Sequence, residues 1–124
     1  GFAILLDGHS IISEAPRFFE GRLPDLNLGT NEGRSCDPGL AVAACGVLGA
    51  APGFTSVHNG RFKGGDITRH YGRPERGIHA LQLEIAQCCY MDERNLELWD
   101  AHRAAPLIAV LRRLAETLLH WMPR

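Results

Sequence analysis

Two polar side chains in this sequence lie next to or within apolar segments. A polar group in such a place is costly to bury unless it has a partner or a function. His9 follows an apolar run within the segment DGHS at 7–10, and Glu84 interrupts another apolar run. A neutral imidazole is the commonest protein ligand of zinc, and Asp7 or Ser10 could orient its ring through a hydrogen bond. A buried carboxylate beside a metal ion can act as a general base. His9 is therefore a candidate metal ligand, and Glu84 is a candidate general base.

Each of these two residues also has a simpler interpretation. A histidine after a strand can do no more than cap the strand through hydrogen bonds. A buried carboxylate can be half of an internal ion pair with an arginine, because an isolated buried charge is costly. From the residues alone, both interpretations stay open for His9 and for Glu84.

The segment NGRFKGGDITRHYGR at 59–73 is the most unusual part of the chain. Residues 61–76 carry five basic and two acidic side chains, whereas the whole chain has a net charge of -1. Paired glycines beside a lysine let backbone N–H groups approach an anion. Arginine side chains can bind a carboxylate or a phosphate through two hydrogen bonds. The segment predicts a site for a small anionic substrate, and a solvated basic loop is the alternative.

The composition limits the class of protein. The chain has 124 residues, of which 45% are hydrophobic and 22% are charged. This is the composition of one globular domain, and it excludes disordered and coiled-coil proteins. No apolar run reaches the length of about 20 residues that a membrane span needs. The near-neutral charge argues against nucleic-acid binding.

The cysteines point to a reducing compartment. Four cysteines are too few for a disulfide scaffold, and no CxxC spacing suggests a zinc knuckle. We therefore expect free thiols and a cytoplasmic protein. The neighbouring residues Cys88 and Cys89 are interpreted as core packing, since adjacent cysteines rarely form a disulfide.

The hydrophobic pattern predicts an α/β fold with a mixed or mostly parallel sheet. Three apolar segments predict strands, and two segments with helical spacing predict helices. The expected strands are 2–6, 54–57 and 78–85, and the expected helices are 38–51 and about 104–121. The segments 11–37 and 59–77 lack sustained periodicity and predict loops, with a possible short strand at Ile67-Thr68.

The first residues suggest that part of the domain is missing from this sequence. The chain starts at Gly1 and enters an apolar strand at once. Such a strand is typical of the inside of a sheet. We therefore expect the N-terminal part of the domain to be absent and apolar surface to be exposed at residues 2–6.

Six short motifs occur in an order that resembles a known family. They are DGHS at 7–10, LNLGTN at 26–31, CDP at 36–38, NGRFKGG at 59–65, TRHYG at 68–72 and LQLE at 81–84. From about residue 3 to residue 120, the chain resembles the N-formylglutamate amidohydrolases, also called N-formylglutamate deformylases, of bacterial histidine degradation.

The resemblance implies a fold and a reaction. The fold would be a mixed sheet flanked by helices, as in zinc carboxypeptidases and aspartoacylases, with residues 1–124 forming the C-terminal portion of a single domain. The reaction would be hydrolysis of N-formyl-L-glutamate to formate and L-glutamate. One zinc ion would be held by two histidines and a carboxylate.

The resemblance also implies roles for individual residues. His9 resembles one zinc-binding histidine, and Glu84 resembles the glutamate that activates water. The segment 59–69 resembles the part that binds the substrate's carboxylates. Arg69 is the first candidate, followed by Lys63 and Arg61, and Asn59 and the adjacent His70 are further candidates.

One departure from the family pattern matters. The family's other zinc-binding histidine and its carboxylate ligand precede the position of Asp7, and this sequence lacks that segment. The chain alone is therefore expected to bind zinc poorly and to be inactive, because one histidine cannot fill a site that needs three ligands. Three other possibilities stay open. They are an amidohydrolase for another N-acyl amino acid, a metal-free module that binds small carboxylates, and a fragment without function. The expected partner is a small anionic substrate, and the oligomeric state is left open.

Overall fold

A computed structural model describes residues 1–95 and 98–124 of the chain. It contains four strands, three α-helices and two short 3₁₀ helices in this part of the chain. In chain order the main elements are β1 (Ala3–Ile11), β2 (Leu26–Gly29), α1 (Pro38–Gly49), β3 (Ser56–His58), α2 (Asp66–Tyr71), β4 (Ile78–Ala86) and α3 (Ala101–His120). The 3₁₀ helices are Pro74–Arg76 and Gln87–Cys89.

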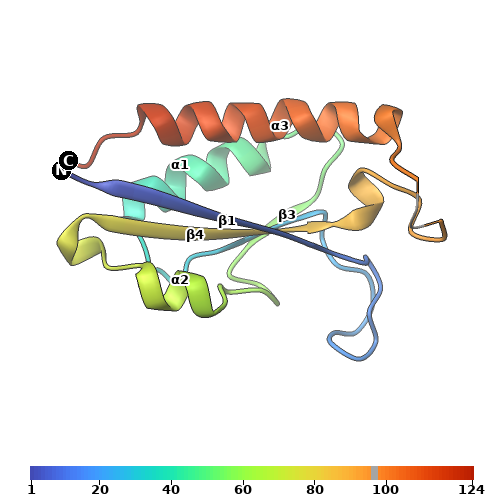
Figure 1. The fold of residues 1–124 in the computed structure, drawn as a ribbon, viewed down its shortest axis with the longest axis horizontal. Coiled ribbons are helices and arrows are strands. Elements are labelled where there is room, and N and C mark those ends of the chain that lie inside the picture. Colours follow the sequence, from blue (N-terminus) through green and yellow to red (C-terminus); the bar gives the residue numbers. More distant parts are fainter. Residues whose placement is uncertain (96–97) are drawn as a thin grey trace.

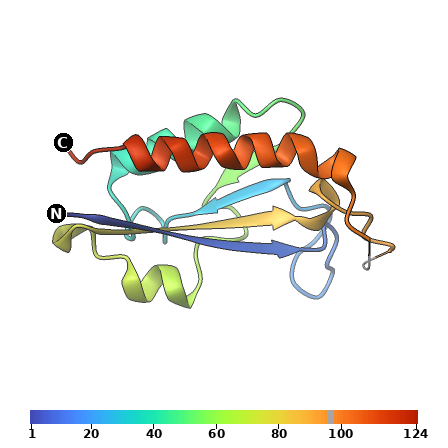
Figure 2. The same ribbon diagram turned by 45° about the horizontal axis from the view of Figure 1, so that its top comes forward.

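The strands form one mixed sheet in the order β1-β4-β2-β3. β1 runs parallel to β4, β2 runs antiparallel to β4, and β3 runs parallel to β2. Helices α1 and α3 cover one face of the sheet, and α2 lies on the opposite face (Figures 1 and 2). The predicted α/β class with a mixed sheet flanked by helices is thus confirmed.

The core lies between the sheet and the helices α1 and α3. Alternation along β4 points Leu81 and Leu83 toward these helices. α3 contributes a stripe of buried residues at helical spacing, as predicted: Ala104, Leu107, Val110, Leu114 and Leu118. Each fully buried leucine stabilises the fold by about 1.5 to 3 kcal/mol. One face of the sheet therefore packs against α1 and α3, and the opposite face is left for polar side chains.

Both long helices begin at aspartate caps. The Asp37 side chain accepts a hydrogen bond from Gly39 N, and Pro38 takes the first helical position, as predicted for α1. The Asp100 side chain accepts hydrogen bonds from His102 N and Arg103 N. Helix α3 therefore begins at Ala101 instead of the predicted position near 104. None of the described helices is both long and apolar enough to cross a membrane.

Three sequence predictions about local structure are wrong. β1 continues to Ile11, so His9 lies inside a strand and not after it. The apolar pattern stops at Asp7 because residues 7–10 are polar or glycine, while the backbone pairing of β1 with β4 continues to Ile11. The pair Ile67-Thr68 belongs to helix α2 and not to a short strand. The segment predicted as one long loop contains β2, which at four residues is too short to show a period.

Candidate active site

His9 and Glu84 lie opposite each other on neighbouring strands. The parallel pairing of β1 with β4 aligns His9 with Glu84, and Asp7 with Gln82. Side chains alternate along a strand, and Ile4 and Leu6 line a groove with α3. Asp7 and His9 therefore point to the opposite face of the sheet, away from α1 and α3. Two distant polar segments of the sequence meet on this face.

Asp7 holds the imidazole of His9. The distance from His9 Nε2 to Asp7 Oδ2 is 2.8 Å, and the Asp7 side chain is only 15% exposed. The prediction that Asp7 or Ser10 could orient the ring is thus confirmed for Asp7. The hydroxyl of Ser10 instead lies 2.8 Å from the hydroxyl of Tyr90. A histidine fixed through one ring nitrogen can present the other nitrogen in a defined direction.

Glu84 is a buried carboxylate, only 7% exposed. Burial raises the pKa of Glu84, because the charged form is poorly solvated. The charge of His9 lowers the pKa, and the charge of Asp7 raises it further. No arginine or lysine within the described ranges forms an ion pair with Glu84, so the simpler interpretation as half of an arginine pair finds no support there. A carboxylate with a raised pKa is suited to accept and return a proton near neutral pH.

Asn27 on β2 lies in register with Glu84 on β4 and His9 on β1. The sequence did not predict Asn27 as a residue of this site. It pairs with Glu84 across β2 and β4 and is 1% exposed. Its Nδ2 donates to the carbonyl oxygens of Pro24 and Glu84, at 2.7 and 3.1 Å. Its Oδ1 has no hydrogen-bond partner in the described part of the chain. The sequence signal that could have identified Asn27 is its position between two leucines in LNLG at 26–29, because a polar side chain between apolar residues is often buried.

The glycine-rich basic loop lies against this face of the sheet. Gly65 N donates to Gln82 Oε1 at 2.7 Å, two residues before Glu84 on β4. Gly29 pairs with Gln82 across the sheet and lies directly under the loop. A Cβ atom at Gly29 would stand 2.5 Å from the backbone of Lys63 and Gly64. The loop approaches the sheet as closely as it does because position 29 has no side chain.

The three predicted basic residues each contact a group of this chain. Arg69 Nη2 lies 3.1 Å from Asp66 Oδ1, and Arg69 Nη1 donates to the Gly64 carbonyl oxygen. Lys63 Nζ pairs with Glu32 at 2.8 Å. The hydrogen bond and the charge of Lys63 lower the pKa of Glu32. All three side chains are exposed, and an ion pair between exposed side chains contributes little stability. Arg61 Nε donates to the Phe18 carbonyl oxygen.

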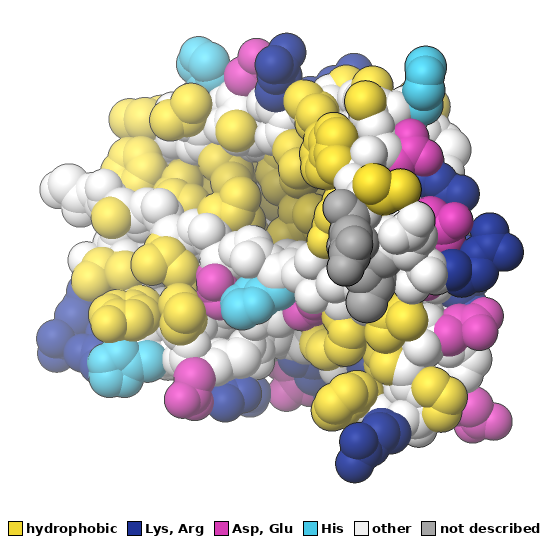
Figure 3. All heavy atoms as spheres, turned by 45° about the vertical axis from the view of Figure 1, so that its right-hand side comes forward, with side chains coloured by type: hydrophobic (Ala, Val, Ile, Leu, Met, Phe, Trp, Pro, Cys, Tyr) yellow, Lys and Arg dark blue, Asp and Glu magenta, His cyan; other side chains and the backbone are white. Residues whose placement is uncertain are grey.

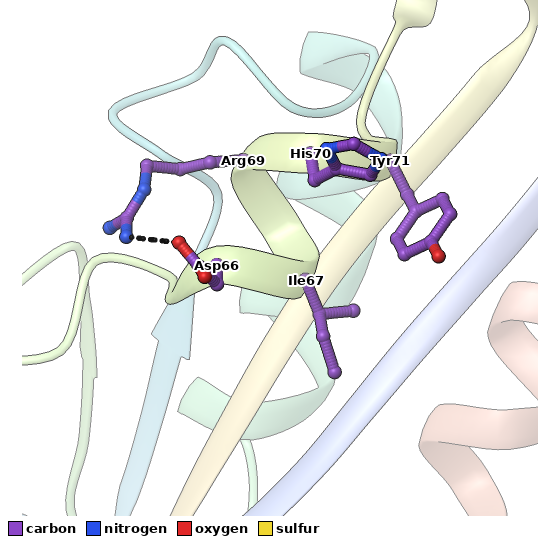
Figure 4. Close-up of a pocket in the computed structure, with 5 residues that line it drawn as sticks. All are labelled: Asp66, Ile67, Arg69, His70 and Tyr71. Carbon is purple, nitrogen blue, oxygen red and sulfur yellow. Dashed lines mark hydrogen bonds and ion pairs between the residues drawn. The ribbon is translucent and has the colours of Figure 1, made fainter.

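Asn59 and His70 have different local roles. Asn59 has a positive φ of 52°, and its Oδ1 accepts a hydrogen bond from Thr30 N. This bond ties the start of the basic loop to the end of β2. His70 packs its ring edge-on against Tyr71, and both residues line a cavity of about 450 Å³ beside α2. Figure 4 shows Asp66 and Arg69 turned together on one side of this helix, with Ile67 and Tyr71 on another.

A second cluster contains thiols. Asp25, Cys88 and Cys89 bring three possible ligand atoms within 4.8 Å of one another. Asp25 already accepts hydrogen bonds from Thr55 and from the guanidinium of Arg22, which also lies 3.4 Å from Cys88 Sγ. Burial raises the pKa of the Cys89 thiol. A cation would have to displace Arg22 and ionise a buried thiol, so the cluster fits a structural role better than a metal centre.

Known proteins similar to this chain share one description. The family model described as N-formylglutamate amidohydrolase matches residues 1–91. An N-formylglutamate deformylase of Pseudomonas aeruginosa is 57% identical over 121 residues, which are 98% of this chain and 46% of that protein. An N-formylglutamate deformylase of Pseudomonas putida is 52% identical, with 98% of this chain and 45% of that protein covered.

The fold has a solved counterpart as well. The crystal structure of an N-formylglutamate amidohydrolase from Ralstonia eutropha JMP134 superposes with a TM-score of 0.76 at 28% identity. The match covers 95% of this chain and 42% of that protein. The chain thus spans about half the length of the curated relatives and of the solved structure that it matches.

Proposed function

The chain belongs to the N-formylglutamate amidohydrolase family, and on that premise we propose that it carries part of the site that hydrolyses N-formyl-L-glutamate to formate and L-glutamate. The observation that supports this most is the alignment of His9 with the buried Glu84 on one sheet face. Asp7 beside His9 and the basic loop beside Gln82 fit the same reaction. Because the chain spans about half of its relatives, the complete site would include groups from the other half of the domain.

We propose zinc as the metal and His9 as one of its ligands. With Nε2 held by Asp7, the ring can offer the Nδ1 lone pair. No three ligand atoms gather around His9 within residues 1–95 and 98–124, so this chain fits one ligand position and not a complete centre. When bound, zinc would supply a Lewis acid that polarises the amide carbonyl and favours attack by water at neutral pH.

Glu84 is proposed as the general base. Its carboxylate takes a proton from the attacking water as the new carbon–oxygen bond forms. It then gives this proton to the nitrogen of the departing glutamate as the carbon–nitrogen bond breaks. Burial serves this role because it raises the pKa of Glu84 toward the range in which a proton can be both accepted and returned.

The basic loop is proposed to bind the carboxylates of the substrate. Arg69 is the first candidate because its side chain is 55% exposed and its guanidinium carries five donors in a planar fork. Lys63 and Arg61 follow, and Asn59 holds the loop to β2. The zinc-carboxypeptidase type of fold, a role in histidine degradation and a cytoplasmic location belong to the same proposal.

A chimera tests this proposal. The 121 matched residues of this chain would replace the corresponding segment of the Pseudomonas aeruginosa deformylase, since the two are 57% identical over this length. Release of formate from N-formyl-L-glutamate by the zinc-loaded chimera would support the proposal. A folded, zinc-loaded chimera that releases no formate would contradict it, and activity on another N-acyl amino acid alone would correct the substrate.

A further inference from the structure

The basic loop at 59–65 is not held in place by the apolar core. None of its residues is buried, and its one aromatic side chain, Phe62, packs edge-on against Phe19 of another loop. The core lies on the other face of the sheet. In Figure 3 charged side chains of both signs are spread over the lower part of the molecule, where α2 lies in Figure 1. Polar contacts must therefore fix the position of the loop.

Several of these contacts converge on the hydroxyl of Thr30, the residue directly after β2. Thr30 is 0% exposed. Its Oγ1 accepts hydrogen bonds from Gly33 N at 3.1 Å and from Asn59 Nδ2 at 3.0 Å. A hydroxyl has two lone pairs and one proton, so both lone pairs are used. The proton must go to His58 Nε2, which lies 2.8 Å away.

The network has only one arrangement of donors and acceptors. His58 Nε2 also lies 3.1 Å from Asn59 Nδ2, so two donors point at this ring nitrogen. Nε2 therefore carries no proton, and the imidazole proton is on Nδ1. The Asn59 amide is fixed as well, because its Oδ1 accepts a hydrogen bond from Thr30 N at 2.9 Å. Each of these polar groups thus depends on the others.

The same junction concentrates backbone strain. In the part of the chain that the structure describes, the non-glycine residues with positive φ are Asn31, Glu32 and Asn59. Asparagine tolerates this conformation better than most residues, but Glu32 adopts it at a cost. Such residues persist where surrounding contacts hold them, and they are common at functional sites. The Thr30 hydroxyl holds both strained segments, because it bonds to Gly33 on one side and to Asn59 on the other.

The turn that follows Thr30 holds the basic residues of the loop. Asn31 N donates to the Lys63 carbonyl oxygen at 2.6 Å. The next carbonyl oxygen, that of Gly64, accepts a hydrogen bond from Arg69 Nη1 at 3.2 Å. The backbone at 63–64 therefore connects the Thr30 turn with both basic side chains.

We propose that Thr30 is a positioning residue, whose hydroxyl sets where Lys63 and Arg69 lie and contacts no substrate atom. The inference rests on the proposed function, in which these basic residues bind the carboxylates of the substrate. The hydroxyl spends all its hydrogen-bonding capacity within the chain. His9 and Glu84 lie on β1 and β4, outside this network. Loss of the hydroxyl should therefore weaken substrate binding and leave the chemical step intact.

The test compares Thr30→Val with Thr30→Ser in the zinc-loaded chimera. Valine keeps the shape of the side chain and removes the hydroxyl, whereas serine keeps the hydroxyl. KM for N-formyl-L-glutamate should rise about 10- to 100-fold in Thr30→Val at similar kcat, and Thr30→Ser should stay within about threefold of the parent. Thr55→Val is the matched control, since it removes a hydroxyl that bonds to Asp25 and not to the loop. It should lower the melting temperature and leave KM unchanged.

Hydrogen exchange separates this inference from the proposed function, because it needs no substrate. The Asn31 amide, which bonds to Lys63, should exchange at least about tenfold faster in the Thr30→Val chimera than in the parent and unchanged in Thr55→Val. Unchanged exchange in Thr30→Val would overturn the inference. Faster exchange with an unchanged KM would also overturn it, because the hydroxyl would then be structural only. A parent chimera without activity would refute the proposed function, and exchange alone would then decide whether Thr30 positions the loop.

A measurement on the unmodified 124-residue chain decides the matter if Thr30→Val does not fold. The nitrogen NMR shifts of the His58 ring report which nitrogen carries the proton. A proton on Nδ1 is the expected result. A proton on Nε2 would overturn the inference, because the Thr30 hydroxyl could then not donate to His58 while it holds Gly33 and Asn59.

Discussion

His9 on β1 and Glu84 on β4 are register partners, although they come from different halves of the sequence. Their side chains leave the sheet on the face opposite to the core helices. Asp7 fixes the imidazole, and burial raises the pKa of the carboxylate. The pairing of two strands thus sets the relative position of the two groups on which the proposed chemistry depends.

Glu84→Gln should stabilise the isolated chain at neutral pH. The folded pKa of Glu84 is raised above its ordinary value of 4.5, so the folded state holds this proton more tightly than the unfolded state. Stability contributed by the protonated form is therefore lost as pH rises from about 4.5 through the folded pKa. The glutamine variant lacks this loss. Its melting temperature at neutral pH should rise by a few degrees, on a scale of about 4 °C per kcal/mol.

Melting temperatures of both proteins from about pH 4 to about pH 8 check this prediction. The difference between the two melting temperatures at each pH reports on Glu84 alone, because the other titrating groups are the same in both proteins. A glutamine variant that is about 3 to 5 kcal/mol less stable at neutral pH would contradict it. Such a loss would identify Glu84 as half of a buried ion pair.

Asp7→Asn should weaken zinc binding in the chimera. Asp7 holds His9 at 2.8 Å, and removing the partner of a metal-binding histidine costs about 10- to 100-fold in metal affinity. Ser10→Ala is the matched control, since its hydroxyl contacts Tyr90 instead of His9. Chelator competition measures both affinities, and equal zinc affinity in the two variants would refute the role assigned to Asp7.

Gly29→Ala should destabilise the chain and displace the basic loop. The new Cβ would lie 2.5 Å from the backbone of Lys63 and Gly64, so the loop would have to move. We expect a loss of about 1 to 3 kcal/mol, the usual cost of overpacking. Gly46→Ala in α1 is the control, because no atom lies within 4 Å of its Cβ, and it should stabilise by about 0.5 to 1 kcal/mol. Urea unfolding compares the two, and an equal effect of both would show that the loop does not depend on Gly29.

Arg69→Ala in the chimera should impair substrate binding more than turnover. A charge-assisted carboxylate contact contributes about 1.5 to 3 kcal/mol, so KM should rise roughly 10- to 100-fold at similar kcat. Asp66→Asn is the control, since it removes the partner of Arg69 but leaves the guanidinium in place. Steady-state kinetics decide: an unchanged KM for Arg69→Ala, with a raised one for Lys63→Ala or Arg61→Ala, would move the contact to that residue.

The sequence predicted the parts of the fold that carry a strong pattern. The cap at Asp37 and the apolar stripe of α3 were recognisable because capping and helical spacing are local. β2 was missed because four residues buried on both faces show no alternation. α2 was mistaken for a strand because a six-residue helix within a polar loop shows no apolar stripe.

The same distinction holds for the site. His9 and Glu84 stand out because each polar group interrupts or follows an apolar run. Their alignment depends on the register of β1 with β4, which no local pattern encodes. Asn27 was overlooked as a site residue because its position beside Glu84 appears only when β2 is placed next to β4.

The most direct test of the account is the turnover of the zinc-loaded chimera carrying Glu84→Gln. Glutamine keeps the size of the side chain but cannot take the proton from water. The variant should keep its zinc and its fold, while kcat for N-formyl-L-glutamate falls by about 10² to 10⁴. Near-normal turnover with zinc bound would contradict the account, because Glu84 would then be a buried structural carboxylate and not the general base.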